Sequence, residues 1–214
     1  MDGIDWQVIL IGGNTGAGKT YLAQELTRHF RISSLLVDDV RIAIQQVTSP
    51  SKQPDLHVFL NYTPEQWKIP KIIVEDWIRV GNAIARPLIA IIEHHLIVSS
   101  SGKVIIEGDG ILPALASQLV FQKENEQVKI ENSSKIHFMF LVEDDEDRIL
   151  NNLRNRGRGF CKNNQEIQQA FAHASFLYGK WLLEEAKSEN LSVVLSYPVE
   201  TVIRRTLNEI RARI

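Results

Sequence analysis

The chain has 214 residues, 44% of them apolar and 23% charged, which is enough to bury one substantial core, and we expect one domain with an inserted segment. A formal net charge of -2 at pH 7 argues against a surface built for nonspecific attraction to duplex DNA or anionic lipid. With one cysteine, Cys161, no intramolecular disulfide can form, and a cytoplasmic protein is expected. The apolar stretch at 88–98 is too short for a membrane span, which needs about 20 residues.

Short apolar runs alternate with helical patterns along the chain. Nearly continuous apolar runs predict strands at 6–12, 33–39, 103–108, 135–142 and 191–197. Apolar residues at helical spacing predict helices at 19–30, from Thr63 onwards, and at 199–214, with Gly81 and Pro87 kinking or dividing the second of these. The polar residues 122–134 are interpreted as a solvated connection.

Apolar strands separated by helices indicate a parallel sheet that is covered on both faces. In such a fold ligands bind at the carboxyl ends of the strands. Acidic residues fall at these ends: Asp38 and Asp39 follow the second predicted strand, and Glu107 and Asp109 follow the third.

A glycine-rich stretch, GNTGAGKT, joins the first predicted strand to the first predicted helix. It matches G-x-x-x-x-G-K-[ST] in the strand-to-helix context that makes this pattern credible, and this context favours a phosphate-binding loop over a turn with an exposed lysine. The backbone amides and the helix start would hold phosphates, Lys19 would add a positive charge, and Thr20 would offer a hydroxyl to Mg2+. The predicted nucleotide-binding residues are Gly13, Asn14, Thr15, Gly16, Ala17, Gly18, Lys19, Thr20 and Tyr21.

Four stretches together resemble a known family: GGNTGAGKT, LVDDVR, VIIEGDGILP and RILNNLRNRGRGF. The chain is similar to the P-loop small-molecule kinases related to nucleoside monophosphate kinases, and nearest in appearance to the 2-phosphoglycerate kinase, zeta-toxin-type and polynucleotide 5′-kinase branches. A guanine-reading N-K-x-D motif is missing after the fourth predicted strand, where the chain reads FLVEDDEDR. The glycine stretch is the specific part of this resemblance, and residues 42–102 match no motif of the family.

The resemblance implies roles for the stretch after the second strand. In that branch an aspartate contacts the acceptor hydroxyl, as a base or by orienting it, and an arginine three positions later holds an acceptor anion. Asp38 is the first candidate for this aspartate and Asp39 the second, with Arg41 as the arginine. For Asp39 the alternative is an N-cap of the following helix.

Glu107 and Asp109 flank a glycine in the turn after the third strand. The resemblance implies that the acid here reaches the magnesium shell or touches the acceptor, and we assign Glu107 to the metal and Asp109 to the substrate. Turn chemistry is the alternative for Asp109, because Asp next to Gly is common in turns.

An arginine-rich stretch follows the fourth strand, where nucleoside monophosphate kinases carry a lid. Arg154, Arg156 and Arg158 are predicted to stabilise the transferred phosphoryl group, because guanidinium groups pair well with phosphate oxygens. The alternative is that these three arginines bind a nucleic-acid backbone. Arg148 lies four residues after Asp144 and fits a salt-bridged helix instead. The turn LSYPVET resembles the segment that borders adenine in these kinases.

These observations lead to one expectation about fold and function. We expect a three-layer α/β P-loop domain over 1–214 with a five-stranded parallel sheet in the order 2-3-1-4-5, a helical acceptor-binding insertion at 42–102 and a lid at 144–165. The expected reaction is transfer of the γ-phosphoryl group of Mg2+-ATP to a small-molecule hydroxyl or phosphate. A nucleic-acid 5′-hydroxyl kinase and a nucleotide-dependent regulatory ATPase are the alternatives, no membrane partner is expected, and a homodimer is left open.

Overall fold

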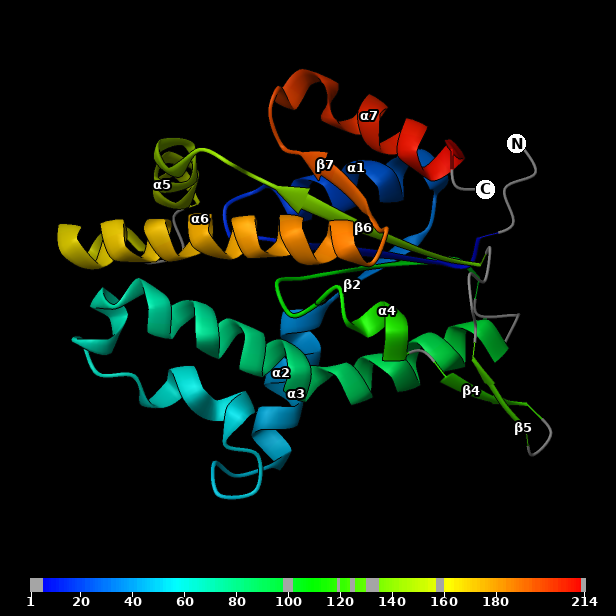
Figure 1. The fold of residues 1–214 in the computed structure, drawn as a ribbon, viewed down its shortest axis with the longest axis horizontal. Coiled ribbons are helices and arrows are strands. Elements are labelled where there is room, and N and C mark those ends of the chain that lie inside the picture. Colours follow the sequence, from blue (N-terminus) through cyan, green and yellow to red (C-terminus); the bar gives the residue numbers. More distant parts are fainter. Residues whose placement is uncertain are drawn as a thin grey trace.

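A five-stranded, all-parallel sheet forms the centre of the molecule, with helices on both faces (Figure 1). The computed structural model describes residues 6–97, 102–118, 120–123, 126–129, 135–156 and 160–212. The strands are β1 (Val8–Gly13), β2 (Ser33–Leu36), β3 (Val104–Glu107), β6 (Ile136–Val142) and β7 (Ser192–Leu195). Their order across the sheet is β2-β3-β1-β6-β7, which confirms the predicted order 2-3-1-4-5.

The helices connect these strands and cover the sheet. They are α1 (Lys19–Phe30), α2 (Val37–Val47), α3 (Pro70–Ile97), α4 (Leu115–Gln118), α5 (Glu146–Asn155), α6 (Gln165–Ser188) and α7 (Val199–Ala212). In the described part of the chain, short 3-10 helices lie between them at η1 (Asp55–Asn61), η2 (Gln66–Lys68) and η4 (Phe160–Lys162). No helix in the described part of the chain is long and apolar enough to cross a membrane.

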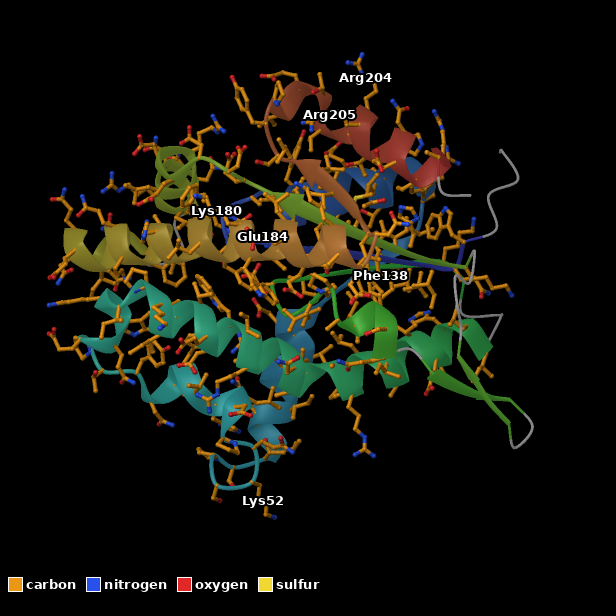
Figure 2. All side chains as sticks on the ribbon, in the orientation of Figure 1. Lys52, Phe138, Lys180, Glu184, Arg204 and Arg205 are labelled. Carbon is orange, nitrogen blue, oxygen red and sulfur yellow. The ribbon has the colours of Figure 1, made fainter. Side chains whose placement is uncertain are left out.

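The position of β1 at the centre of the sheet explains why its residues are apolar on both faces. Val8 and Leu10 belong to a core with α3 and α6, whereas Ile9 and Ile11 belong to a second core with α1 and α7. Both faces of the strand are therefore buried, as expected for a parallel sheet between two helix layers. Side chains fill the space between sheet and helices, where Phe138 lies, and Lys52 extends outward from the loop after α2 (Figure 2).

The second strand is shorter than predicted. It ends at Leu36, and the chain passes directly into α2, so Asp38 and Asp39 lie in the first turn of a helix and not at a strand end. The N-cap of α2 is Leu36, which corrects the alternative that Asp39 caps this helix. Both acids are still favourably placed, because the positive end of the helix dipole stabilises carboxylates.

Two other expectations differ from the structure. The segment 122–134, interpreted as a solvated connection, overlaps an antiparallel pair of strands, β4 (Val120–Lys123) and β5 (Glu126–Lys129). Helix α3 is continuous through Gly81 and Pro87, so the expectation that they divide it is wrong, whereas the expected kink stays a prediction. At Gly81 a Cβ would lie 2.6 Å from the side chain of Leu112, so this glycine allows a close approach to the turn after β3. Burial of Ile84, Leu88 and Ile92 on the same helix stabilises it despite the proline.

Candidate functional site

The glycine loop, residues 13–20, lies at the carboxyl end of β1 and turns into α1. Gly13, Gly16 and Gly18 have φ angles of 145°, 88° and 90°. Residues other than glycine rarely adopt such angles. A Cβ on Gly13 would also lie 2.0 Å from the carbonyl oxygen of Leu141. Gly18 is the N-cap of α1 and supplies no side-chain hydrogen bond, so the first amides of the helix are left for an anion.

A buried asparagine fixes the glycine loop to the rest of the molecule. The side-chain amide of Asn14 donates to the carbonyl oxygens of Glu143 at 3.0 Å and Ser175 at 3.1 Å, and its oxygen accepts from the Glu143 amide. The Ser175 hydroxyl donates to the carbonyl oxygen of Thr15 at 2.6 Å. A Cβ on Gly179 would lie 3.0 Å from the Asn14 amide nitrogen, so α6 must be narrow at this point. No motif in the sequence points to Ser175 or Gly179.

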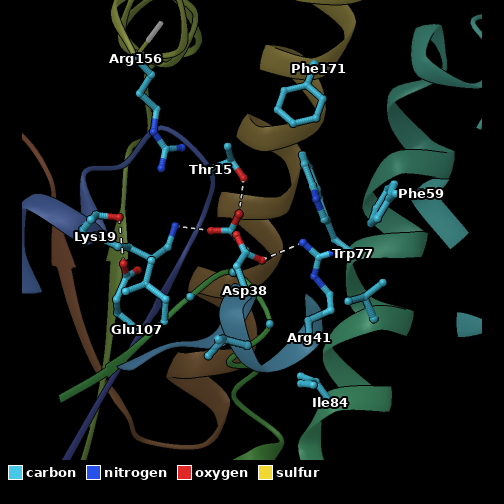
Figure 3. Close-up of a pocket in the computed structure, with 17 residues that line it drawn as sticks. Thr15, Lys19, Asp38, Arg41, Phe59, Trp77, Ile84, Glu107, Arg156 and Phe171 are labelled. Carbon is cyan, nitrogen blue, oxygen red and sulfur yellow. Dashed lines mark hydrogen bonds and ion pairs between the residues drawn. The ribbon is translucent and has the colours of Figure 1, made fainter. Parts of the chain in front are cut away.

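Lys19 and Asp109 are brought together at the mouth of the loop. The Lys19 ammonium donates to the carbonyl oxygen of Asn14 at 2.9 Å and forms an ion pair with Asp109, which also accepts from the Thr15 hydroxyl at 2.5 Å (Figure 3). Burial by itself would raise the pKa of Asp109, but the charge and hydrogen bonds of Lys19 and Thr15 outweigh it and hold this pKa below its usual value. Asp109 is therefore ionised at neutral pH.

Glu107 and Thr20 face each other at the end of β3. The Thr20 hydroxyl donates to Oε1 of Glu107 at 2.8 Å, and the Glu107 side chain is buried. Burial raises the pKa of Glu107, and the Lys19 charge and the Thr20 hydrogen bond offset only part of this effect. A buried carboxylate with one hydroxyl neighbour is a candidate ligand for a hard cation.

A first cavity of about 210 Å³ opens beside the glycine loop (Figure 3). It lies between the loop, the start of α2, the turn after β3, and side chains of η1, α3 and α6. Its lining residues are Thr15, Lys19, Thr20, Leu36, Val37, Asp38, Arg41, Phe59, Trp77, Val80, Ile84, Glu107, Gly108, Asp109, Gly110, Arg156 and Phe171.

The two candidate aspartates differ in position. Asp38 lines the first cavity, and its Oδ1 accepts from Arg41 at 3.0 Å. Asp39 is exposed and is not among the residues that line this cavity. In Figure 3, Asp38 lies between Lys19 and Glu107 on one side and the aromatic side chains on the other.

A second cavity of about 440 Å³ lies on the other side of the glycine loop. Its walls are the glycine loop with α1, the ends of β6 and β7, the last turn of α5 and the start of α7. The lining residues are Gly16, Ala17, Gly18, Lys19, Thr20, Tyr21, Leu22, Leu141, Glu143, Asn152, Arg156, Ser196, Val199 and Val202. Three residues, Lys19, Thr20 and Arg156, line both cavities.

The arginines after β6 separate into different environments. Arg148 forms ion pairs with Glu143, Asp144 and Asp145 at 2.8 to 3.2 Å. The pair with Asp144 is the one expected from the sequence. Arg154 donates to Gln168 at 2.9 Å, and Arg156 lines both cavities. Arg158 lies outside the described residues.

Several lining residues escaped the sequence analysis. Glu143 is buried and accepts hydrogen bonds from Ser196, Arg148 and the Asp145 amide, so it joins the ends of β6 and β7 to the start of α5. Asn152 donates to the carbonyl oxygen of Gly16 at 3.0 Å. Phe59, Trp77 and Phe171 come from distant parts of the chain and meet only in the folded protein. Their apolar character resembles that of any core residue, so no local signal identifies them.

The sheet order β2-β3-β1-β6-β7 and the glycine loop between β1 and α1 define a P-loop α/β fold. No family model matches the chain. The chain is 25% identical to 2-phosphoglycerate kinase of Methanocaldococcus jannaschii over 215 residues, 97% of this chain and 64% of that protein. It is also 25% identical to 2-phosphoglycerate kinase of Pyrococcus horikoshii over 213 residues, 95% of this chain and 64% of that protein. The resemblance to P-loop small-molecule kinases is confirmed, and the chain spans slightly less than two thirds of these relatives.

Solved structures with a similar arrangement include a gluconokinase from Sinorhizobium meliloti, with a TM-score of 0.49, 12% identity and coverage of 98% of this chain and 93% of that one. A deoxyadenosine kinase from M. mycoides with bound dCTP has a TM-score of 0.47 and 16% identity, with coverage of 96% and 100%. Likeness at this level does not bear on the activity of this chain.

Proposed function

We propose that the protein is a kinase that transfers the γ-phosphoryl group of Mg2+-ATP to a hydroxyl or phosphate group of a small molecule. One observation carries the proposal: the cavities on the two sides of the glycine loop meet at Lys19, Thr20 and Arg156. A donor nucleotide in the second cavity and an acceptor in the first would place the transferred group beside two cationic side chains and a hydroxyl. This is the arrangement that phosphoryl transfer requires.

The second cavity suits a nucleoside triphosphate. The glycine loop and the start of α1 would hold its phosphates, and Ser196, Val199 and Val202 lie where the nucleoside would extend. The phosphate loop supports a nucleoside triphosphate as the donor, and we take ATP as this donor. A single cysteine fits a cytoplasmic enzyme.

Thr20 and Glu107 would hold the magnesium ion. Mg2+ at nucleotide sites takes one or two protein oxygens, and phosphates and water supply the other ligands. The Thr20 hydroxyl and the Glu107 carboxylate, 2.8 Å apart, fit this description. Among the described residues no group of three or more His, Cys, Asp or Glu could hold a metal ion without the nucleotide. When bound, magnesium neutralises charge on the β- and γ-phosphate oxygens.

The remaining residues have roles that follow from their positions. For a hydroxyl acceptor, Asp38 takes the proton while the acceptor oxygen bonds to the γ-phosphorus. The bond from the γ-phosphorus to the bridging oxygen breaks, and ADP leaves with the electron pair. Lys19 and Arg156 stabilise the negative charge on the transferred group.

Two segments of the chain supply parts of this machinery. Residues 42–102 contribute Phe59, Trp77, Val80 and Ile84 to the acceptor side, which supports their assignment as the acceptor-binding segment. Arg156 lies in the 144–165 segment and lines both cavities, which supports the lid assignment. The small volume of the first cavity favours a small acceptor over a nucleic-acid end.

The test is ADP release with Mg2+-ATP and a panel of acceptors that includes 2-phosphoglycerate, sugar acids, nucleosides and 5′-hydroxyl oligonucleotides. We expect one acceptor class to raise ADP release, and Lys19→Ala to remove this increase. Lys52→Ala, a change of an exposed lysine outside both cavities, is the matched control and is expected to leave the rate unchanged. An equal, slow rate with every acceptor and in Lys19→Ala would refute the kinase proposal.

A further inference from the structure

We propose that the acceptor is an uncharged alcohol attached to a flat, unsaturated ring, and that the ring binds against Phe59, Trp77 and Phe171. This inference rests on the proposed kinase function and names the substrate class of the first cavity. It differs from what the relatives' name offers, because 2-phosphoglycerate has no ring and is strongly anionic.

Three aromatic side chains form one wall of the first cavity. Phe59 comes from η1, Trp77 from α3 and Phe171 from α6. Trp77 and Phe171 meet edge to face, with ring centroids 5.2 Å apart and an interplanar angle of 79°. Each of the three is partly exposed, so its ring is available to a ligand (Figure 3). Aromatic surfaces of this kind bind flat rings by stacking or edge contact.

Phe59 is held in place from behind. Its ring stacks on that of Trp67 with centroids 5.7 Å apart, and its centroid lies 5.0 Å from that of the Tyr62 ring. The Tyr62 hydroxyl donates to the buried carboxylate of Asp76 at 2.5 Å, and this bond joins the loop after η1 to α3. A wall fixed in this way loses little conformational entropy when a ring binds.

Trp77 is fixed by α6. The ring centroids of Trp77 and the buried Tyr178 lie 5.5 Å apart. Tyr178 in turn stacks on Trp181, with ring centroids 5.6 Å apart. The Tyr178 hydroxyl donates to the carbonyl oxygen of Asp109 at 2.7 Å. The same side chains therefore orient both the aromatic wall and the turn that carries Asp109.

The charges of the first cavity disfavour a strongly anionic acceptor. Its charged lining residues are the cations Lys19, Arg41 and Arg156 and the acids Asp38, Glu107 and Asp109. Arg41 is paired with Asp38, and Lys19 is needed by the donor phosphates. An acceptor with a phosphate and a carboxylate would add several negative charges to this balanced set, beside the triphosphate, without cations to match them.

The other wall and the volume complete the description. Leu36, Val37, Val80 and Ile84 are apolar and would enclose the ring. A volume of about 210 Å³ suits one small ring with its hydroxyl arm. With the ring at the aromatic wall, the arm would extend toward Asp38, where its oxygen bonds to the γ-phosphorus and its proton passes to the carboxylate.

The experiment compares kcat/KM for three acceptor groups with the whole chain and Mg2+-ATP: nucleosides, hydroxymethyl-substituted aromatic rings, and the ring-free acids 2-phosphoglycerate and gluconate. We expect turnover of the nucleosides or of the hydroxymethyl-substituted rings. The group with the higher kcat/KM shows whether the ring is a nucleobase or a simple aromatic ring. Phe171→Leu is expected to raise the acceptor KM about tenfold and to leave the KM for ATP unchanged. Phe176→Leu is the matched control, since this phenylalanine is on the same helix, is also partly buried, and does not line the cavity.

Turnover restricted to the ring-free acids, or equal acceptor KM values in Phe171→Leu and Phe176→Leu, would overturn the ring assignment and leave the kinase function standing. If every acceptor fails while ATP still protects the protein from thermal unfolding, both proposals are wrong. Phe171→Tyr keeps a ring at this position and is expected to restore the KM, which separates loss of stacking from loss of folding.

Discussion

The carboxylate of Asp109 contacts the ammonium group of Lys19, the lysine of the glycine loop. Lys19 is also the cation that we propose for the donor phosphates, so Asp109 and these phosphates would compete for it. The lysine of this ion pair is buried, so we expect Asp109 to weaken nucleotide binding.

Asp109→Asn is expected to tighten ADP binding about three- to tenfold, because the amide does not compete for Lys19 with a full charge. Isothermal titration with ADP and Mg2+ measures the change. Asp39→Asn, an exposed acid on α2, is the matched control and is expected to leave the Kd unchanged. Weaker ADP binding by Asp109→Asn would show that Asp109 supports nucleotide binding.

Asp38→Asn is expected to lower kcat by about 100-fold or more with a hydroxyl acceptor, since the amide cannot take the acceptor proton. Asp39→Asn is expected to change kcat less than about threefold, because Asp39 does not line the first cavity. Steady-state rates with the acceptor found in the screen measure both. The assignment of Asp38 fails if the two variants are equally active.

Arg156→Ala is expected to reduce kcat by about 100-fold or more, because Arg156 lies where the two cavities meet and its charge would act on the transferred group. A change of Arg154, which donates to Gln168, is expected to have a smaller effect on kcat. Single-turnover rates at saturating ATP and acceptor separate this effect from binding. A larger loss in Arg154→Ala than in Arg156→Ala would reverse the order of importance.

Tyr62→Phe is expected to lower the free energy of unfolding by about 1 kcal/mol near neutral pH, since it removes the hydrogen bond to Asp76. The variant also tests a pH dependence. Burial, the hydrogen bond to Asp76 and its negative charge raise the pKa of Tyr62 well above its ordinary value of 10.0.

Above this ordinary value the unfolded chain releases the Tyr62 proton while the folded chain retains it, so stability falls as the pH rises. Tyr62→Phe is expected to reduce this loss of stability at high pH. Some loss remains in the variant, because burial also raises the pKa of Tyr178. Urea unfolding at about pH 8 and about pH 11 measures the difference. An equal pH dependence in the two proteins would mean that Tyr62 has an ordinary pKa.

The glycine loop was predictable because its function depends on local backbone geometry. Gly13, Gly16 and Gly18 adopt φ angles that glycine accepts most readily, and the flanking strand and helix follow from their own apolar spacing. The order of the five strands followed from the family resemblance. The end of β2 was predicted too late, because apolar residues continue through Val37 into the first turn of α2.

The sequence by itself determined the parallel sheet, the phosphate-binding loop and the set of acids and arginines near it, because local spacing and residue chemistry encode these features. Only the tertiary structure decided which of them share a site. It placed Asp38 in the first cavity and Asp39 outside it. Arg148 forms ion pairs with Glu143 and its neighbouring acids. Phe59, Trp77 and Phe171 come together from three distant elements. These relationships depend on how helices pack across the sheet, and contacts between residues far apart in the chain leave no periodic signal in one sequence.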